Sequence, residues 1–461
     1  MTLTFSKSVG NSKLMQKMNQ LRILNYIRSH QQTTRQQIVH DTGISASAVT
    51  NIVNNLISRS FIIETGTAGS ALAGRKAKLL FFNPSVRKVI CVSIDPAYVI
   101  IALTDLAGNA MSTRQISLQG QEDDQSILEL VSHEIQTVIK MADSYTEVRL
   151  AGIAVATSGI VLNHAELLLS TKMQWKSVDI KHVLESQFRL PVFVQNKTRT
   201  KIMHQLRHHL EHDDDRVIFL DMEVGIGLAS FVGARLDESV LGEIGHTTIV
   251  KDGLLCFCGN HGCLEMYCNV PAVIRQTQAL LARGSCPVLA GVLAMSDRAL
   301  TYEMVLDALH QGDPDVSRVI ESCGQYLGIA LANIISLFQP DLILINGERL
   351  LTEESIFYLA VSEAGRRINS QLFSRTRLIR VQISLDDEIR GIAQYITEKL
   401  CTAPILEQES AGFEKSRKLA KPNGRTKVDG QTKVDSHTKV DGHTKVDSHV
   451  KAASKKPHSS K

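Results

Sequence analysis

A histidine and three cysteines lie close together in the segment GEIGHTTIVKDGLLCFCGNHGCLE. The four residues are His246, Cys256, Cys258 and Cys263. One imidazole and three thiolates form a complete tetrahedral ligand set for Zn²⁺, and a site without an open position is structural rather than catalytic. Two glycines inside the segment permit the tight turns that this spacing requires. Disulfides are the alternative, although the cytosol would keep such thiols reduced.

Five further cysteines are scattered along the chain without the spacing of metal ligands. They are Cys91, Cys268, Cys286, Cys323 and Cys401. No pattern identifies a partner base, so the sequence does not mark any of them as a nucleophile. We expect them to be buried thiols, because free cysteine is among the most buried residue types.

The first 82 residues predict helices joined by a turn. Apolar residues recur at helical spacing in a first segment: Leu14, Met18, Leu21, Leu24 and Ile27. Thr34-Arg35-Gln36-Gln37 fits a capping box that begins a short second helix through His40, and Gly43 can take the positive φ of the following turn. Ser45 can cap a third helix. The buried stripe of that helix would be Val49, Ile52, Val53, Leu56 and Ile57.

Two strand candidates follow the third helix. They are residues 61–63 and 78–82, and they enclose a tip that contains Gly74-Arg75-Lys76. The order helix, helix, turn, helix, hairpin is typical of a winged helix-turn-helix, whose last helix reads the major groove. The candidate DNA-binding residues are Arg35, Ser45, Ser47, Thr50, Asn51, Asn54, Arg75 and Lys76. The alternative is a small helical bundle with a solvated polar face.

Strand and helix patterns alternate in the middle of the chain. The strand candidates are 88–94, 98–104, 149–156, 191–195, 216–221, 226–232 and 341–346, and the helix candidates are 126–141, 198–210, 270–283 and 316–338. This alternation predicts an α/β body, and its size favours two lobes. We expect domains at residues 1–82, 83–402 and 403–461.

The charge of the chain divides in the same three parts. Residues 1–82 hold 10 Lys and Arg against 2 Asp and Glu, residues 83–414 hold 28 against 41, and residues 415–461 hold 13 against 4. A net charge of +4 therefore hides two basic ends and an acidic body, and basic ends favour nucleic acid contact. Residues 426–449 repeat a polar six-residue unit with one Val, which predicts a disordered tail.

The 461 residues contain no run of 18 apolar residues, so we expect no membrane insertion. The N-terminus lacks the apolar segment and cleavage site of a secretory signal. A cytoplasmic location is the expectation.

The motif GEIGH followed by CxCGxxGCLE resembles the signature of the ROK family (repressors, open reading frames and sugar kinases), over roughly residues 15–400. With the winged helix-turn-helix before it, the chain resembles the repressor branch of that family, of the NagC and Mlc type. The resemblance implies an actin-like, two-lobed body that forms a homodimer or homotetramer on a palindromic DNA operator. It also implies a sugar site at Gly159, Asn196, Glu243, His246 and Glu265.

Three departures from the family's kinases argue against an enzyme. The first phosphate loop, Asp-x-Gly-x-Thr in kinases, is matched by the stretch Ser93-Ile94-Asp95-Pro96-Ala97-Tyr98, which has no Gly or Thr. The second loop becomes Glu223-Val224-Gly225-Ile226-Gly227, which gains a carboxylate. The catalytic Asp of the kinases is replaced by Lys197, and a protonated lysine cannot accept a proton from a sugar hydroxyl.

Lys197 leaves two hypotheses for the effector that the body senses. In the first, Lys197 pairs with an anionic effector such as a sugar phosphate. In the second, the sugar site is degenerate and the body senses a sugar-transport protein. The sequence predicts a transcriptional regulator, most simply a repressor of sugar uptake or catabolism genes. The alternatives are a ROK sugar kinase acting on glucose or an N-acetylhexosamine, and a nucleic acid binder that depends on its basic ends.

Overall fold

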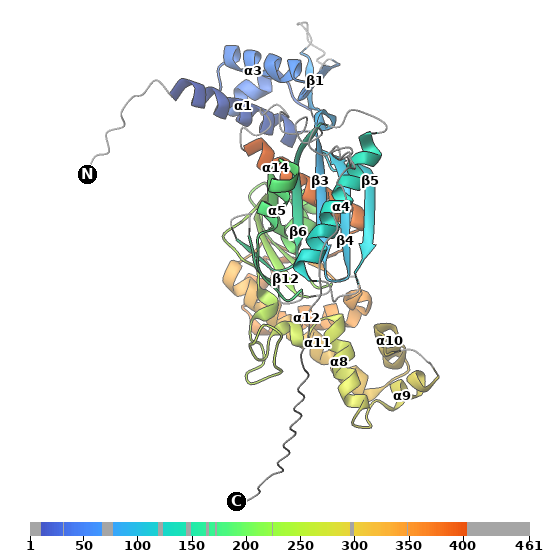
Figure 1. Ribbon diagram of the computed structural model, residues 1–461. Helices are drawn as coiled ribbons and strands as arrows, with labels where there is room; N and C mark the ends of the chain where they lie inside the picture. Colours follow the sequence, from blue (N-terminus) through green and yellow to red (C-terminus); the bar gives the residue numbers. More distant parts are fainter. Residues whose placement is uncertain are drawn as a thin grey trace, which may run out of the picture. The chain divides into compact units, whose positions relative to one another are not determined.

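The computed structural model describes residues 11–30, 32–66, 77–118, 123–143, 149–162, 166–170, 173–223, 225–295, 299–347 and 349–402 (Figure 1). The predicted disordered tail and the Gly74-Arg75-Lys76 tip lie outside these ranges, so what we expect of them stays a prediction. We call the described residues up to Phe82 the head and those from Asn83 to Thr402 the body.

The head contains three helices and a hairpin, in the predicted order. The helices are α1 (Asn11–Ser29), α2 (Arg35–Thr42) and α3 (Ala46–Ser58), and the strands are β1 (Ile62–Thr65) and β2 (Leu79–Phe82). The capping box at Thr34 is confirmed: its side chain accepts from the Gln37 backbone, and the Gln37 side chain accepts from the Thr34 N–H at 3.0 Å. Gly43 ends α2 with φ 68° and Ser45 caps α3, as predicted.

The first two turns of α1 differ from the prediction. Leu14 and Met18 are 57% and 62% exposed, whereas Ile23, Leu24 and Ile27 are buried. The reason is length: α2 and α3 have 8 and 13 residues, and they cannot cover all 19 residues of α1.

The body contains two five-stranded sheets with the same topology. In each, three antiparallel strands are followed by two strands parallel to the first. The first sheet has the order β10-β6-β3-β4-β5 and consists of β3 (Lys88–Asp95), β4 (Tyr98–Asp105), β5 (Ala110–Ser117), β6 (Leu150–Thr157) and β10 (Val192–Asn196). The second has the order β13-β12-β11-β14-β15 and consists of β11 (Arg216–Asp221), β12 (Gly227–Val232), β13 (Arg235–Leu236), β14 (Leu342–Asn346) and β15 (Arg377–Val381). The predicted α/β body is confirmed.

A helix at the end of the described chain, α14 (Leu385–Thr402), lies between the two sheets. Successive strand residues alternate between faces, so Val89 and Cys91 of β3 pack in one core with α14, while Ile90 and Val92 pack on the other side. The inner face of the second sheet joins the same core as α14. Two short helices accompany α14 there, α6 (Lys197–Lys201) and α7 (Met203–Leu206).

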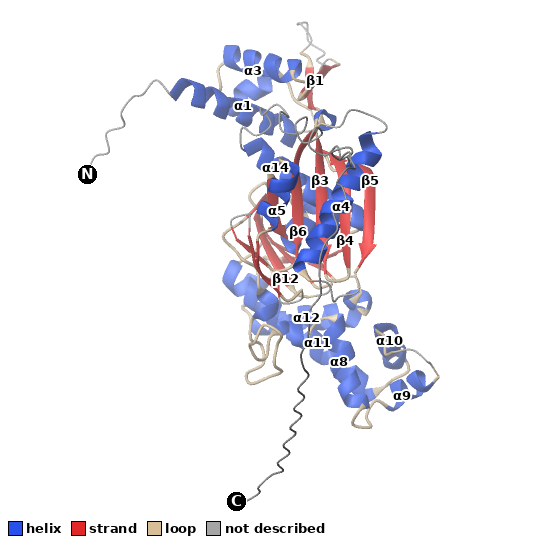
Figure 2. Ribbon diagram, viewed as in Figure 1, coloured by secondary structure: helices blue, strands red, loops and turns tan. Residues whose placement is uncertain are grey.

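Other helices cover the outer faces of the sheets (Figure 2). On the first sheet these are α4 (Asp124–Asp143) and α5 (Ile180–Phe188), beside a small sheet of β7 (Ile160–Leu162), β8 (Glu166–Ser170) and β9 (Trp175–Val178). Near the second sheet lie α8 (Val270–Leu281), α9 (Pro287–Ala294), α10 (Tyr302–His310), α11 (Pro314–Phe338), α12 (Glu354–Arg367) and α13 (Ser370–Phe373). By length and composition α11 is apolar enough to cross a membrane, but its apolar window is 61% buried, as in a core helix.

One predicted helix, residues 198–210, is wrong as a single element. The structure divides it into α6 and α7, with the break at Ile202. At this break the backbone of α6 meets α14 so closely that a Cβ on Gly391 would lie 2.1 Å from the Thr200 carbonyl oxygen. The periodicity of one segment cannot reveal such a contact with a distant helix.

Candidate functional site

A cavity of about 400 Å³ opens where strands of both sheets end. The ends of β3, β6 and β10 border it from the first sheet, and β11 and β12 border it from the second. The structure brings all five predicted sugar-site residues to this cavity: Gly159, Asn196, Glu243, His246 and Glu265.

Gly159 and Asn196 form one wall. Gly159 has φ 116°, and a Cβ there would lie 2.3 Å from the Leu169 carbonyl oxygen, so glycine is required. The Asn196 Nδ2 donates to the Gly159 carbonyl at 2.7 Å, and its Oδ1 accepts from the Thr198 N–H at 2.9 Å. Asn196 therefore caps α6 and fixes the turn at Gly159. An amide has two donors and an acceptor with two lone pairs, which leaves capacity for a ligand.

Lys197 lies at the next position, in a buried group of charges. Its Nζ is 3.1 Å from Asp95 Oδ2, 3.2 Å from Glu388 Oε1 and 2.7 Å from the Tyr98 hydroxyl. The Ser93 hydroxyl of β3 donates a hydrogen bond to the Glu388 carboxylate. Burial alone would lower the pKa of Lys197, but the charges of Glu388 and Asp95 outweigh it and raise that pKa above its ordinary value. The ammonium stays protonated and offsets one of the two carboxylate charges.

A second lysine on α6 repeats this arrangement one turn later. Lys201 Nζ lies 3.1 Å from both carboxylate oxygens of Asp221, at the end of β11. Asn346 donates to the same carboxylate at 2.7 Å. The loop that follows β11 contains Gly225 and Ile226. Glu265 holds this loop by accepting a hydrogen bond from the Ile226 N–H at 2.9 Å.

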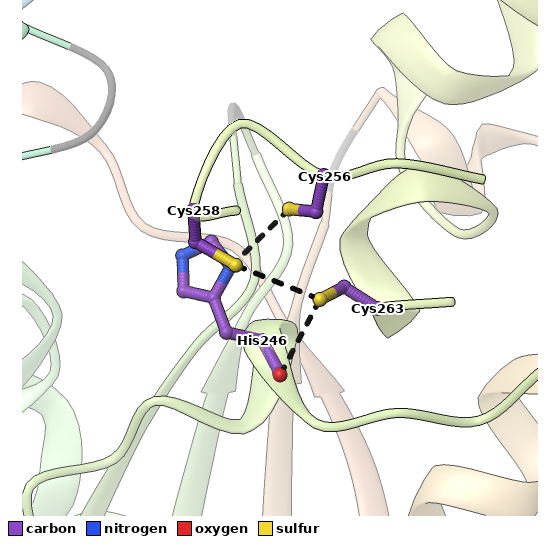
Figure 3. A group of neighbouring side chains, drawn as sticks. All are labelled: His246, Cys256, Cys258 and Cys263. Atoms are coloured by element: carbon purple, nitrogen blue, oxygen red, sulfur yellow. Dashed lines mark hydrogen bonds between the residues drawn. The ribbon is translucent and has the colours of Figure 1, made fainter. Parts of the chain in front are cut away.

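The predicted metal ligands converge on one point, as Figure 3 shows. The ligand atoms of His246, Cys256, Cys258 and Cys263 all lie within 4.8 Å of one another. The sulfurs of Cys258 and Cys263 are 3.7 Å apart, and Cys256 Sγ is 3.6 Å from His246 Nδ1. Zn–S and Zn–N bonds of about 2.3 and 2.05 Å give tetrahedral edges of about 3.8 and 3.6 Å. The donor set and its spacing fit a tetrahedral metal site.

The two nitrogens of His246 face different partners. Nδ1 faces the thiols, while Nε2 is 3.9 Å from Glu243 Oε2 at the cavity. A metal on Nδ1 would leave Nε2 to carry the proton, and this fixes the ring orientation toward the cavity. The metal cluster and the cavity therefore share one side chain.

The five remaining cysteines are buried, as expected. Cys286 lies near Asp313 and Asp315, a second group at metal-binding distance. Both carboxylates already accept hydrogen bonds from backbone N–H groups, those of Asp313 at the first turns of α9 and α11 and that of Asp315 from Cys286. These bonds explain the cluster as helix capping.

The predicted DNA-binding residues lie mostly on one surface of the head. Ser47, Thr50, Asn51 and Asn54 are exposed on α3, and Ser45 is exposed at its N-terminus. Arg35 pairs with Glu64 of β1 and donates to Asn54 at 3.0 Å, so it links α2 to α3 and the wing. Arg75 and Lys76 lie outside the described residues.

The ROK family profile matches residues 89–394. The chain belongs to the ROK family. The match contains both sheets from β3 onward, the cavity and the four clustered metal-ligand candidates.

Two named regulators are similar to a longer part of this chain than the family profile matches. The xylose repressor of Bacillus subtilis (strain 168) is 23% identical over 395 residues, which cover 85% of this chain and 97% of that repressor. The DNA-binding transcriptional dual regulator NagC of Escherichia coli (strain K12) is 27% identical over 386 residues, covering 82% of this chain and 91% of NagC. Coverage of 85% cannot be reached without residues before position 89, so the xylose repressor match includes part of the head.

Solved ROK structures share the fold. A ROK family transcriptional regulator, a homologue of the E. coli Mlc protein, has a TM-score of 0.72 and 24% identity, and covers 86% of this chain and 100% of its own. A ROK glucokinase from Streptomyces griseus, solved with glucose and AMPPNP, has a TM-score of 0.55 and 22% identity, and covers 67% of this chain and 98% of its own.

Several residues of the ROK cavity were missed by sequence reasoning. They include Tyr98, Lys201, Asp221, Arg349 and Glu388. Glu388 lies on α14, and its partner Lys197 is almost 200 positions earlier in the chain, so no local motif connects the two. The pattern of charges at positions 197 and 201 is the one signal that was present, because these positions share a helix face.

Proposed function

We propose that this chain is a sugar-responsive transcriptional repressor of the ROK family that acts in the cytoplasm on double-stranded operator DNA. The observation that carries the proposal is the combination of two sites in one chain. A helix-turn-helix head exposes a polar third helix, and a ROK body holds a cavity lined by groups that bind hydroxyls. The match to the xylose repressor includes the body and part of the head.

The head would bind DNA through α3. Ser47, Thr50, Asn51 and Asn54 offer short hydrogen-bonding groups to base edges in the major groove. Arg35 and the two basic residues at the tip of the wing would contact phosphates. Two heads reading one palindrome require at least two chains, so we propose a homodimer or homotetramer.

The effector we propose is an uncharged sugar. Six carboxylates and three cations line the cavity: Asp95, Asp221, Glu223, Glu243, Glu265 and Glu388, and Lys197, Lys201 and Arg349. Each of the three cations already contacts a carboxylate. Lys197 contacts Asp95, Lys201 contacts Asp221, and Arg349 lies 3.2 Å from Glu303. An anionic sugar phosphate would therefore meet excess negative charge, whereas sugar hydroxyls can donate to carboxylates. The geometry disfavours the earlier idea that Lys197 binds a phosphate.

Zn²⁺ is the metal we propose for His246, Cys256, Cys258 and Cys263. Three thiols and one imidazole suit Zn²⁺, and four protein ligands leave no position for a substrate. The metal would hold the loop that carries Glu265 and would orient His246 toward the cavity. Its contribution is therefore structural.

The kinase alternative conflicts with the state of Lys197. A general base must be unprotonated, but the charges of Asp95 and Glu388 stabilise the ammonium form. Asp95 is itself occupied by that ammonium, so it offers little to a nucleotide-bound cation. The likeness to a ROK glucokinase is a likeness of fold.

The test begins with DNA. Genomic fragments that copurify with the protein are sequenced, and the affinity of the enriched sequence is measured by fluorescence anisotropy with and without D-xylose, N-acetylglucosamine or glucose. We expect one palindromic sequence, released by one of these sugars. Titration calorimetry compares the same sugars with their phosphates and with a purified sugar-transport protein, which would be the signal if no sugar binds.

An ATP-coupled assay with glucose, N-acetylglucosamine and N-acetylmannosamine addresses the enzyme alternative. We expect no sugar-dependent ATP consumption. Steady turnover, together with the failure to enrich any DNA sequence, would overturn the proposed function.

A further inference from the structure

The first turn of α14 is part of the cavity wall. Leu385 and Glu388 both line the cavity, and Glu388 is 3% exposed. Its carboxylate is bonded to Lys197 and to Ser93, so α14 is attached to β3 and to α6 at this point. Lys197 also bonds to Asp95, which gives one ammonium for two buried carboxylates.

The packing of α14 beyond this turn leaves little room for independent movement. Gly391 faces the α6 backbone, and a Cβ there would lie 2.1 Å from the Thr200 carbonyl oxygen. On another side, a Cβ on Gly108 would lie 2.8 Å from the Arg390 Cα. Close backbone contacts of this kind make α14 move together with the elements that line the cavity.

The last turns of α14 contact the head. The Asn25 side chain of α1 donates to the Cys401 carbonyl at 3.0 Å, and Arg28 lies 3.8 Å from Glu398. Ile23 and Ile27 of α1 belong to the same buried cluster as Ile396 and Leu400 of α14. From Glu388 to Cys401 the helix rises about 20 Å.

We propose that α14 carries the state of the cavity to the DNA-binding head, and that Lys197–Glu388 is the contact through which occupancy acts on it. The proposal rests on the proposed function for its signal, a sugar in the cavity. Hydroxyl groups of a sugar donate to carboxylates, and they compete with the Lys197 ammonium for Asp95 and Glu388. A ligand that binds one arrangement of this ion pair better than another shifts the position of α14, and thereby that of α1.

Glu388→Gln is the variant that tests this route. It removes one carboxylate and leaves Lys197 paired with Asp95, so one buried cation then faces one buried carboxylate. Asp386→Asn is the matched control, because this substitution removes the same charge from the same turn of α14. The Asp386 side chain is 58% exposed and pairs with Arg390. Both full-length proteins are compared with wild type by hydrogen exchange and by operator affinity.

We expect Glu388→Gln to speed amide exchange in residues 23–28 and to change operator affinity about fivefold or more, with the control near wild type. Asn25→Ala removes the hydrogen bond from α1 to the last turn of α14 and should change exchange in residues 197–201, because coupling is reciprocal. Unchanged exchange at α1 in Glu388→Gln, or equal changes in the control, would overturn the proposal. Altered exchange in a protein that enriches no DNA would instead refute the proposed function and leave the coupling intact.

Discussion

Lys197 is the residue at which this chain differs most in chemistry from a sugar kinase. The Lys197 ammonium forms ion pairs with two buried carboxylates, Asp95 and Glu388. Its charge is needed for stability because these carboxylates would otherwise be buried without a counter-charge. The same residue thus explains the lost base and the organisation of the cavity wall.

We expect Lys197→Met to destabilise the protein by about 3–5 kcal/mol, because Asp95 and Glu388 would face each other without a counter-charge. Urea unfolding monitored by circular dichroism measures the change. Adding Glu388→Gln and Asp95→Asn to Lys197→Met should recover most of the loss. A Lys197→Met protein as stable as wild type would show that the ion pairs contribute nothing.

At the scale of single residues, the sequence predicts those that lie together in one local motif. The metal-ligand candidates span 18 positions, and the candidate sugar-site residues lie in short motifs, so their types and spacing mark them as candidates. Lys201 with Asp221 and Lys197 with Glu388 are brought together by strand and helix packing across the two sheets. Nothing in either segment alone marks its partner.

Helix α3 is the element on which the DNA prediction depends. Its buried side chains Val49, Ile52, Val53 and Leu56 fix its orientation in the head, and this leaves Thr50 and Asn51 on the exposed face. The amphipathic period and the Ser45 cap made this helix predictable. The exposed start of α1 was not predictable, because apolar spacing does not reveal how long the neighbouring helices are.

Asn51→Ala should weaken specific operator binding by about 1–3 kcal/mol, the usual contribution of one good base contact. Nonspecific binding to random DNA should stay the same, since phosphate contacts are retained. Gln36→Ala, an exposed change on α2, is the control. Anisotropy titrations with operator and scrambled duplexes measure both; equal weakening on the two DNAs would exclude base reading by Asn51.

On α14, Glu398 connects stability to pH. Burial raises the pKa of this carboxyl, which Arg28 only partly opposes. The folded state therefore favours the protonated form, and the stability contributed by this group is lost as pH rises above its ordinary value of 4.5. We expect Glu398→Gln to be more stable than wild type at pH 7 and to lose this advantage near pH 4. Thermal melts across this range measure the difference; a constant difference would contradict the assignment.

At the scale of the whole molecule, shared parts connect the cluster of metal-ligand candidates, the cavity and the head. His246 belongs to the metal cluster and to the cavity, and α14 belongs to the cavity and to the core that includes the head. The family signature made the body's fold predictable from the sequence. The five-layer order, with α14 between the sheets, was not, because residues 385–402 show no feature that assigns them to the centre.

Removal of zinc tests the structural role of the metal cluster. Elemental analysis of wild type should give one zinc per chain, and Cys256→Ser/Cys258→Ser should contain none. We expect that variant to melt at a lower temperature and to lose oligomerisation and operator binding, because the loop with Glu265 is no longer held. Wild-type operator affinity and oligomeric state in the zinc-free protein would refute the prediction.

Deleting residues 415–461 tests whether the basic tail is needed for DNA binding. We expect specific operator affinity to survive, since the base contacts are assigned to the head. The loss of 13 Lys and Arg should reduce nonspecific affinity and its dependence on salt. Anisotropy at several salt concentrations separates the two effects; loss of specific binding would favour a binder driven by its basic ends.

The contact between α1 and α14 also limits how this protein can be taken apart. Ile23, Leu24 and Ile27 are at most 3% exposed, and their buried cluster includes residues of α2, α3 and α14, the last of which lies more than 350 residues later in the chain. A fragment that stops at residue 82 would lose the α14 side of this cluster, expose apolar surface there and tend to aggregate. A chimera that grafts another regulator's head onto this body needs an α1 whose surface matches α14. Heads and bodies in this architecture are therefore expected to be inherited together.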